Sequence, residues 1–351
     1  MDRERRVLIT GGAGFVGSNL AARLIRDGAF VDCVDSLVTG RIDSIQALRA
    51  SERFRFFRQD VSHADFVQLG LTNRYTEIYH LACPTGVPNI RTLGEEMVQA
   101  CSHGTEHVLR IACAHDARLV YTSSAEVYGD PEESPQREVY CGKVDPTGPR
   151  SAYEEGKRFG ETLVRLYADK YRVEGKIVRI FNTYGPGMSP DDTRVIPRFL
   201  RHIRDKRKIV IYGDGKQTRT HLYVDDLIEA LVQVAHDGAR GEVYNIGGDR
   251  ELSILELVDV LRTLTPLPVE VEHEPHFIED HRGRLPATTK VRGLGWAPRV
   301  PLADGLRRML ESYGMPISEQ ADDRITRRTR RRGITGTVVV SRPHDEEVLA
   351  Q

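Results

Sequence analysis

A glycine-rich segment near the N-terminus restricts the possible folds of this chain more than any other feature. The apolar run at residues 7–10 leads directly into GGAGFVG at residues 11–17, and a helical pattern follows over residues 18–27. A second apolar run, residues 30–34, then ends at Asp35. This order of buried strand, spaced glycines, helix, strand and acid predicts a Rossmann-type parallel sheet that binds a dinucleotide.

The spacing of the glycines gives each of them an expected role. Gly11 permits a tight turn, Gly14 lets a pyrophosphate approach the backbone, and Gly17 lets the helix pack closely on the strand. The N-terminus of the following helix offers free N–H groups to the phosphates. Asp35 lies where a carboxylate accepts hydrogen bonds from the adenosine ribose, and its charge would repel a 2′-phosphate. The predicted cofactor is therefore NAD rather than NADP.

Length and charge exclude several classes of function. The 351 residues are enough for a full α/β core and exceed the usual size of one domain. The 50 basic and 51 acidic residues nearly cancel, so no overall field favours nucleic acid or a membrane surface. No run approaches the ~20 apolar residues that cross a bilayer, and the charged N-terminus does not resemble a signal peptide.

Cysteine and histidine usage adds two expectations. The five cysteines are scattered and lack CxxC spacing, which favours reduced thiols and a cytoplasmic protein. The 12 histidines show no recognisable ligand spacing. His103 and His107 are four residues apart, but no acidic or thiol ligand motif accompanies them, so no metal site is predicted.

Short apolar runs alternate with helical patterns along the first half of the chain. The predicted strands cover residues 78–82, 118–122 and 176–180, and the predicted helices cover residues 97–115 and 151–171. This alternation predicts an α/β fold with a doubly wound parallel sheet. Because ligands bind at the carboxyl ends of such strands, we expect Asp60, Ala82 and Ser124 to lie around one crevice.

The pattern changes near residue 181, which indicates a second part of the molecule. We expect an NAD-binding Rossmann domain over residues 1–180 and a smaller mixed α/β substrate-binding domain over residues 181–314, with some interleaving of the two. Residues 315–351 contain RRTRRR at 327–332 without interleaved aromatic residues. A solvated, poorly ordered tail is therefore favoured over a segment that binds nucleic acid or anionic lipid.

Two stretches thirty residues apart carry the predicted chemistry. TSSAEVYG at residues 122–129 supplies a hydroxyl and a carboxylate, and SAYEEGK at residues 151–157 places Tyr153 four residues before Lys157. On a helix these two side chains share one face. The ordinary pKa of tyrosine is ~10, and both the lysine ammonium and an oxidised nicotinamide would favour the phenolate. The pair can therefore remove a proton from a sugar alcohol near neutral pH.

Over residues 5–314 the chain resembles the extended short-chain dehydrogenase/reductase family, and within it the UDP-glucuronate decarboxylases (UDP-xylose synthases). Several short motifs carry this resemblance. They are VDSLVTGR (34–41), HLACP (80–84), EVYGDP (126–131), GPRSAYEEGKR (148–158), RIFNTYGP (179–186), YGDGKQTR (212–219), YVDDL (223–227), RGRLP (282–286) and LGWAP (294–298).

The resemblance implies roles for individual residues. Ser124 would hydrogen-bond the sugar O4, Tyr153 would be the base, and Lys157 would be its partner and also touch the nicotinamide ribose. Glu126 would lie beside the reacting sugar, and Arg284 near the substrate carboxylate. Further substrate-binding residues would be Pro84, Asn182, Arg194, Tyr212, Gln217, Arg219 and Tyr223. The cofactor-binding set would be Gly11, Gly14, Phe15, Val16, Gly17, Asp35, Ser36, Gly40, Asp60, Val61, Leu81 and Ala82, together with Tyr153 and Lys157.

The resemblance also implies a reaction and an assembly. Oxidation of UDP-glucuronate at C4 would place a ketone β to the C6 carboxylate, so that CO2 can leave and UDP-xylose or UDP-4-keto-pentose is formed. A nucleotide-sugar 4-epimerase that uses the same NAD and Tyr/Lys site is the alternative, and residues 194–199 resemble those of epimerases. A catalytically silent nucleotide-sugar sensor is a third possibility, which the intact base, lysine and hydroxyl disfavour. Relatives pair through the helix that carries Tyr153, which implies a homodimer.

The chain departs from the family pattern on one side of the expected pocket. Ala125 stands where dehydratases carry an aspartate, which argues against dehydration, and where decarboxylases usually have serine. After Pro84 the chain continues with TGVPNI at residues 85–90, so Ile90 replaces a usual tyrosine. Cys101 replaces an asparagine near the cofactor. We therefore expect one wall of the substrate pocket to differ from that of relatives.

Overall fold

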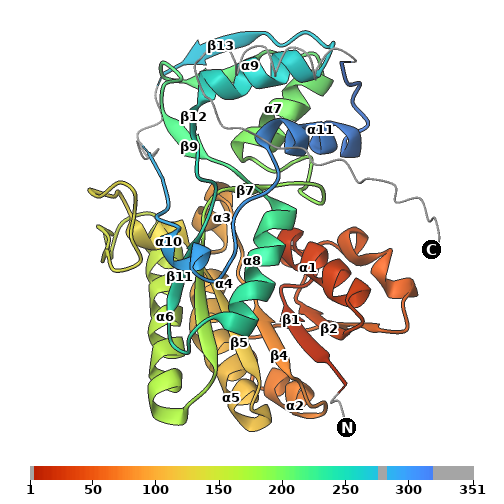
Figure 1. Ribbon diagram of the computed structural model, residues 1–351, viewed down its shortest axis with the longest axis vertical. Coiled ribbons are helices and arrows are strands. Elements are labelled where there is room, and N and C mark those ends of the chain that lie inside the picture. The colour runs from red at the N-terminus through yellow and green to blue at the C-terminus, as the bar shows by residue number, and fades with distance from the viewer. Residues whose placement is uncertain (1–3, 276–282, 319–351) are drawn as a thin grey trace, which may run out of the picture.

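A computed structural model describes residues 4–275 and 283–318 of the chain. Its centre is a seven-stranded sheet, and every pair of neighbouring strands in it is parallel (Figure 1). In spatial order the strands are β3 (Phe54–Arg58), β2 (Phe30–Asp35), β1 (Arg6–Thr10), β4 (Glu77–His80), β5 (Arg118–Ser124), β6 (Gly175–Ile180) and β11 (Val243–Ile246). The predicted α/β class with a doubly wound parallel sheet is confirmed.

Side chains alternate between the two faces of this sheet and enter two separate cores. Along β1, Val7 and Ile9 join the core that includes Leu20 and Leu24 of α1 (Phe15–Arg26). Leu8, between them, joins the core beneath α2 (Asp65–Leu71), α5 (Thr105–His115) and α6 (Ser151–Tyr171). Helix α8 (Val224–Asp237) packs beside α1. Both faces of the sheet are thus covered, as a parallel sheet requires.

The second half of the chain forms a smaller group of elements beyond the carboxyl ends of the strands (Figure 1). It contains three two-stranded pairs, which are β7 (Thr183–Tyr184) with β10 (Leu222–Tyr223), β8 (Ile209–Tyr212) with β13 (Val271–Glu274), and β9 (Thr218–Thr220) with β12 (Glu251–Ser253). Its helices are α7 (Val195–Arg204), α9 (Ile254–Leu264) and α11 (Leu302–Ser312). Helix α8 packs on the large sheet, and β11 is one of its strands. The chain therefore leaves that sheet after β6 and returns to it. The boundary at residues 180/181 stays a prediction.

Helix boundaries differ from the sequence expectation in two informative places. Helix α1 begins at Phe15 rather than residue 18, because Gly14 is already the extended N-cap residue. The helix expected over residues 97–115 is built from α4 (Gly94–Gln99), a π-helical turn η3 (Ala100–Gly104) and α5. Hydrophobic periodicity does not distinguish this widened turn from a regular helix.

The remaining short elements connect the main ones. They are η1 (Ile42–Ile45), η2 (Leu48–Ala50), α3 (Val87–Thr92), η4 (Ala125–Tyr128) and α10 (Thr289–Arg292). No helix in the described part of the chain is both long and apolar enough to cross a bilayer. Among the described residues, no group of His, Cys, Asp and Glu side chains could hold a metal ion. Most of the predicted tail, including the basic run at residues 327–332, lies outside the described residues.

Candidate active site

The turn from β1 into α1 is closely packed, and glycine is required at one position of the loop and at one in the first turn of the helix. Gly11 has a φ of +72°, and a Cβ atom there would lie 2.8 Å from the backbone nitrogen of Ala82. A Cβ atom on Gly17 would lie 2.2 Å from the carbonyl oxygen of Gly11. Gly14, the N-cap of α1, has no side chain to accept hydrogen bonds from the first helical turn. The first turn of α1 therefore offers its backbone N–H groups to an anionic ligand, as a dinucleotide pyrophosphate requires.

Asp35 ends β2 and is held in one orientation by the backbone. Its Oδ2 accepts a hydrogen bond from the N–H of Ala13 at 3.0 Å, and its Oδ1 accepts one from the N–H of Leu37 at 2.8 Å. Burial raises the pKa of Asp35 above its ordinary value, although these two hydrogen bonds act in the opposite direction. Gly40 must lack a side chain, since its Cβ would lie 2.5 Å from Asp35 Oδ1. The carboxylate is thus fixed beside the loop, where a ribose would lie.

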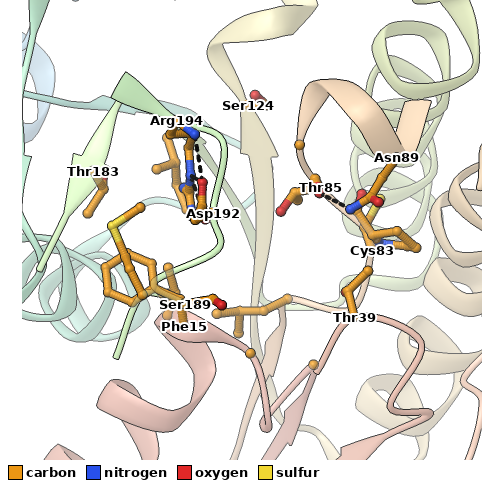
Figure 2. Close-up of a pocket in the computed structure, with 18 of the residues that line it drawn as sticks. Phe15, Thr39, Cys83, Thr85, Asn89, Ser124, Thr183, Ser189, Asp192 and Arg194 are labelled. Atoms are coloured by element: carbon orange, nitrogen blue, oxygen red, sulfur yellow. Dashed lines mark hydrogen bonds and ion pairs between the residues drawn. The ribbon is translucent and has the colours of Figure 1, made fainter. Parts of the chain in front are cut away.

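One large cavity brings the predicted residues of the two halves together (Figure 2). Its volume is about 980 Å³. All predicted cofactor-binding residues line it, and so do all predicted catalytic residues. The predicted substrate-binding residues that line it are Pro84, Glu126, Asn182, Arg194, Tyr212, Gln217, Arg219 and Arg284.

Tyr223 is the predicted site residue that the structure does not bring into this cavity. It is buried in the core, where its ring packs against Tyr184 with 5.6 Å between the centroids. The guanidinium carbon of Arg308, from α11, lies 5.3 Å from the Tyr223 ring centroid. Tyr223 is the last residue of β10 and immediately precedes α8, which directs its side chain toward α11 instead of the ligand space.

Helix α6 presents Tyr153 and Lys157 to the cavity from the same face, as their spacing predicts. Both side chains are buried. The Lys157 Nζ donates a hydrogen bond to the carbonyl oxygen of Thr122 at 2.8 Å and lies 5.2 Å from the ring centroid of Tyr121. Burial alone would lower the pKa of Lys157, but the neighbouring Cys83, Cys101 and Tyr153 raise it above its ordinary value. Lys157 therefore keeps its positive charge.

The pKa of Tyr153 depends on burial as well as on its lysine. Burial raises the pKa of Tyr153 to about 12, whereas the charge of Lys157 and a hydrogen bond with Ser124 act in the lowering direction. The lysine thus acts as the sequence predicts, but burial outweighs it. Tyr153 is a neutral phenol in this state, and it would need a further nearby positive charge to act as a base near neutral pH.

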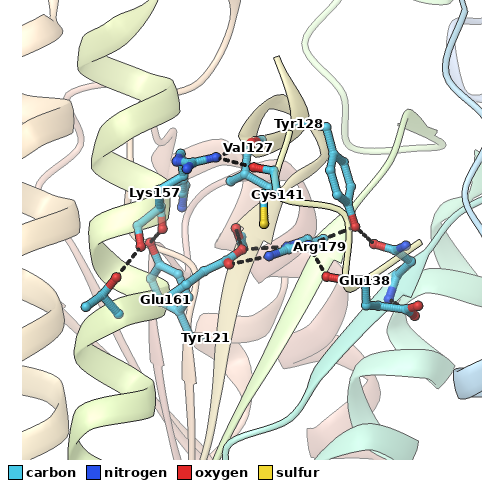
Figure 3. Close-up of polar contacts among 12 residues, drawn as sticks. Tyr121, Val127, Tyr128, Glu138, Cys141, Lys157, Glu161 and Arg179 are labelled. Atoms are coloured by element: carbon cyan, nitrogen blue, oxygen red, sulfur yellow. Dashed lines mark hydrogen bonds and ion pairs between the residues drawn. The ribbon is translucent and has the colours of Figure 1, made fainter. Parts of the chain in front are cut away.

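A partly buried network of polar side chains braces α6 against the sheet (Figure 3). Glu161, on α6, accepts hydrogen bonds from Arg179 of β6 at 2.7 and 2.8 Å and from the Ser123 hydroxyl of β5 at 2.5 Å. Arg179 also donates to the hydroxyl oxygen of Tyr128 at 2.8 Å. A bidentate arginine–carboxylate pair holds both partners in fixed geometry. It fixes the helix one turn beyond Lys157 and so sets the height of the Tyr153 and Lys157 side chains above β5.

Glu126 also lines the cavity and lies between two arginines. Its carboxylate accepts hydrogen bonds from both Nη atoms of Arg284, at 2.5 and 2.9 Å, and from Arg150 Nη2 at 2.5 Å. Arg150 also donates from Nε to Glu154 at 3.0 Å. The Ser124 hydroxyl caps η4 by accepting a hydrogen bond from the N–H of Glu126 at 3.2 Å. The hydroxyl and the carboxylate are thus held by one short turn.

Arg150 lines the cavity, yet the sequence reasoning did not assign it a role. Its position within the motif at residues 148–158, three residues before Tyr153, was the available signal. His221 was also missed. It lines the cavity with a buried Nε2 that has no hydrogen-bond partner among the described residues, and burial together with the charge of Arg219 lowers its pKa to about 4.

One end of the cavity is lined from the smaller half of the molecule. Arg194, which precedes α7, forms an ion pair with Asp192 at 2.6 Å, and its guanidinium carbon lies 5.8 Å from the ring centroid of Phe15. Gln217 donates a hydrogen bond to the carbonyl oxygen of Tyr212 at 3.0 Å. Arginine, amide and aromatic groups of this kind suit a diphosphate joined to a base.

The wall that departs from the family pattern is apolar. Ile90 packs with Met97 against Tyr153, and Cys83 adjoins the same cluster. Asn89 donates a hydrogen bond to the carbonyl oxygen of Thr85 at 2.6 Å, which closes the turn at the start of α3. The Ile90 side chain has no hydrogen-bonding group to offer a ligand at this wall.

The chain matches one protein-family model and is similar in sequence to curated enzymes. Residues 7–247 match the model of the NAD dependent epimerase/dehydratase family. UDP-glucuronic acid decarboxylase 1 of Arabidopsis thaliana is 39% identical over 312 residues, which are 89% of this chain and 70% of the relative. UDP-glucuronic acid decarboxylase 1 of Danio rerio is 36% identical over 321 residues, 91% of this chain and 75% of the relative.

Solved structures agree with this match. UDP-glucuronic acid 4-epimerase from Bacillus cereus, in complex with UDP-glucuronic acid and NAD, superposes with a TM-score of 0.78 at 26% identity, covering 88% of this chain and 99% of that one. UDP-glucose 4-epimerase from Thermotoga maritima, with UDP-glucose, gives a TM-score of 0.81 at 25% identity, covering 88% and 98%.

Proposed function

Because the chain belongs to the NAD dependent epimerase/dehydratase family, we propose that it is an NAD-dependent UDP-glucuronate decarboxylase. It oxidises the sugar at C4, releases the C6 carboxylate as CO2, and gives UDP-xylose, UDP-4-keto-pentose or both. The observation that carries this proposal is the placement of Ser124, Tyr153 and Lys157 in one cavity with Arg284. A phenol base and an arginine that can bind a carboxylate are the two groups that the reaction needs.

The residues around the glycine loop fit NAD. The N–H groups of the first turn of α1 would hold the pyrophosphate, and Asp35 would accept hydrogen bonds from the adenosine ribose. Tyr153 and Lys157 would lie at the nicotinamide end. Bound NAD supplies a hydride acceptor for the oxidation and a hydride donor for the final reduction, and in the oxidised form it carries a positive charge.

Tyr153 would accept the proton of the sugar 4-hydroxyl, with Ser124 as a hydrogen-bond donor to the same oxygen. Lys157 keeps its charge in the buried site, so it favours the phenolate throughout. The pKa of Tyr153, about 12 in the protein alone, would fall when a second positive charge lies nearby. Formation of the Tyr153 phenolate near neutral pH would thus be coupled to the presence of the oxidised cofactor.

Loss of CO2 follows from the position of the ketone. The C5–C6 bond breaks, its electrons form an enolate on O4, and Ser124 and Tyr153 would stabilise that oxygen by hydrogen bonds. A proton then returns to C5. Arg284 would orient the carboxylate before it leaves, with the C5–C6 bond perpendicular to the ketone plane.

Glu126 occupies both Nη atoms of Arg284, so a substrate carboxylate must compete with it. Arg150 would keep Glu126 paired when Arg284 turns to the substrate, because its own hydrogen bond to Glu126 does not involve Arg284. An unpaired buried carboxylate would otherwise oppose substrate binding.

One assay tests the proposed reaction. Purified protein is incubated with NAD and UDP-glucuronate, and CO2 release and product mass are followed. A product lighter by one CO2 supports decarboxylation. An isomer of unchanged mass would instead establish the 4-epimerase alternative, and absence of turnover on several nucleotide sugars would indicate a binding protein.

Replacement of Asp35 is expected to change cofactor affinity. We expect Asp35→Asn to weaken NAD binding by about tenfold, since a neutral amide forms weaker hydrogen bonds to the ribose than a carboxylate does. It should also improve the ratio of NADP to NAD affinity, because the repulsion of a 2′-phosphate is removed. Calorimetric titration with both cofactors measures the two changes, and Asp43→Asn, at an exposed residue, is the control. An unchanged preference would contradict the role of Asp35.

We also propose that two chains pair through α4 and α6. Val98 and Phe159 are 45% and 50% exposed, and they border a shallow cavity of about 320 Å³ between these helices. Phe159→Glu would bury a charge in such an interface and should give monomers in analytical ultracentrifugation. Leu255→Glu, on α9, is the control and should leave the assembly unchanged. Monomers in the unaltered protein would overturn the proposal.

We also propose that the protein is cytoplasmic. All five cysteines are free thiols, including two whose sulfur atoms lie 3.6 Å apart. Thiols this close persist in a reducing compartment. Fractionation of cells that express the protein would test the location, and recovery from an oxidising compartment would contradict it.

A further inference from the structure

Two cysteines from separate segments meet beside the catalytic pair. Cys83 lies three residues after the end of β4 and lines the cavity, where Figure 2 labels it. Cys101 is buried in the π-helical turn η3. Their Sγ atoms are 3.6 Å apart. The mechanism proposed above uses neither thiol.

The surroundings of this pair make it reactive. Hydrogen bonding with Cys83 and the positive charge of Lys157 outweigh burial and lower the pKa of Cys101 to about 6. Hydrogen bonding with Cys101, together with burial, raises the pKa of Cys83 well above its ordinary value. The two sulfurs therefore ionise as a pair, in which loss of one proton is favoured and loss of the second is opposed. A proton shift along the S–S contact places the thiolate on Cys83, which the cavity exposes to small reagents.

We propose that Cys83 and Cys101 form a reversible oxidation site, at which a peroxide converts the two thiols into a disulfide that stops turnover. The Cys83 thiolate attacks one peroxide oxygen, which breaks the O–O bond and gives a sulfenic acid and, after protonation, water. The Cys101 sulfur then displaces the sulfenic oxygen as a second water. The sum is two thiols and one hydrogen peroxide giving one disulfide and two waters, with the sulfurs oxidised and the peroxide reduced.

The disulfide would disturb the catalytic residues in two ways. A bonded pair has an S–S distance of about 2.05 Å, so the two sulfur atoms must approach one another by roughly 1.5 Å, and the segments that carry them must adjust. Gly156 of α6 lies directly against Cys101, since a Cβ there would be 3.4 Å from the Cys101 Cβ, and Cys83 adjoins Ile90 and Tyr153. Oxidation also removes the negative charge that faces Lys157. A shift of about 1 Å beside a reacting group can cost up to ~100-fold in rate.

Peroxide treatment of the full-length protein in a Cys113→Ser/Cys141→Ser background tests the site, because this background removes the two exposed thiols. We expect a loss of mass equal to two hydrogen atoms, a peptide that joins Cys83 to Cys101, and a fall in turnover of about tenfold or more. Dithiothreitol should restore both mass and turnover. A native protein that keeps both thiols under these conditions, or a disulfide-bonded protein with unchanged turnover, would overturn the proposal.

Cys101→Ala and Cys83→Ala, made separately, complete the test. Each is compared with itself before and after peroxide, so its own basal rate does not affect the outcome. Neither should form the crosslink or show a loss that dithiothreitol reverses in full. A reversible loss of turnover of the same size in both variants would contradict the proposal. If only one variant folds, the same reversible loss in that variant would contradict it. The crosslink is read by mass without substrate, so failure of the proposed decarboxylation would remain distinguishable from failure of this inference.

Discussion

Tyr153→Phe is expected to lower turnover of UDP-glucuronate by about 10³-fold, within the range that loss of a general base gives. The substitution removes only the hydroxyl, and the ring keeps its packing against Ile90 and Met97. The base and one of the two donors to the enolate oxygen are then lost together. Initial rates of CO2 release, at saturating NAD and substrate, measure the effect.

NAD affinity should remain within about twofold in this variant, because the loop, helix and carboxylate that would hold the dinucleotide are unchanged. Tyr171→Phe is the matched control, since Tyr171 lies on the same helix and is exposed. It should retain the full rate. Turnover of Tyr153→Phe at the rate of the unaltered protein would exclude Tyr153 as the base.

Arg284→Gln is expected to lower kcat/KM for UDP-glucuronate by about 10²–10³-fold. A charge-assisted hydrogen bond contributes roughly 1.5–3 kcal/mol, and the guanidinium can offer two of them to a carboxylate. Glutamine keeps a similar length but has neither the charge nor the fork of donors. Glu126 would remain paired with Arg150, so the variant should fold.

The step affected by Arg284 can be identified from the cofactor. If Arg284 acts after oxidation, the variant should accumulate reduced cofactor when UDP-glucuronate is added, seen as absorbance of the dihydronicotinamide. Arg292→Gln is the matched control, because Arg292 is paired with Asp249 and does not line the cavity. A kcat/KM for Arg284→Gln equal to that of the control would rule out carboxylate recognition by Arg284.

Local sequence patterns were sufficient for most of the fold. The helix predicted over residues 151–171 has the same bounds as α6, and the predicted strands at 118–122 and 176–180 lie within β5 and β6. These elements are long or strongly periodic, and apolar periodicity reports burial directly. The turn at Ala100–Gly104 was not predicted, because a single i+5 turn leaves the apolar pattern nearly unchanged.

The location of a predicted site residue follows most directly from sequence where the residue ends a strand of the large sheet. Ser124 ends β5 and Asp35 ends β2, so topology alone directs both to the ligand edge. Tyr223 also ends a strand, but that strand belongs to a small pair in the other half, and its ring enters the core. Arg150 was missed because its importance depends on Glu126, which is 24 residues away in sequence.

The doubly wound sheet, the dinucleotide loop and the shared face of Tyr153 and Lys157 could all be predicted from the chain's residues alone, because each depends on spacing within a short segment. Contacts between side chains that are far apart in the sequence follow only from the packing of the whole molecule. That packing placed Arg150 and Arg284 on one carboxylate, brought Cys83 to Cys101, and buried Tyr153 so deeply that its pKa rises to about 12 despite its lysine. Desolvation and through-space electrostatics depend on groups far apart in the chain, so they follow from the packed structure and not from any local pattern.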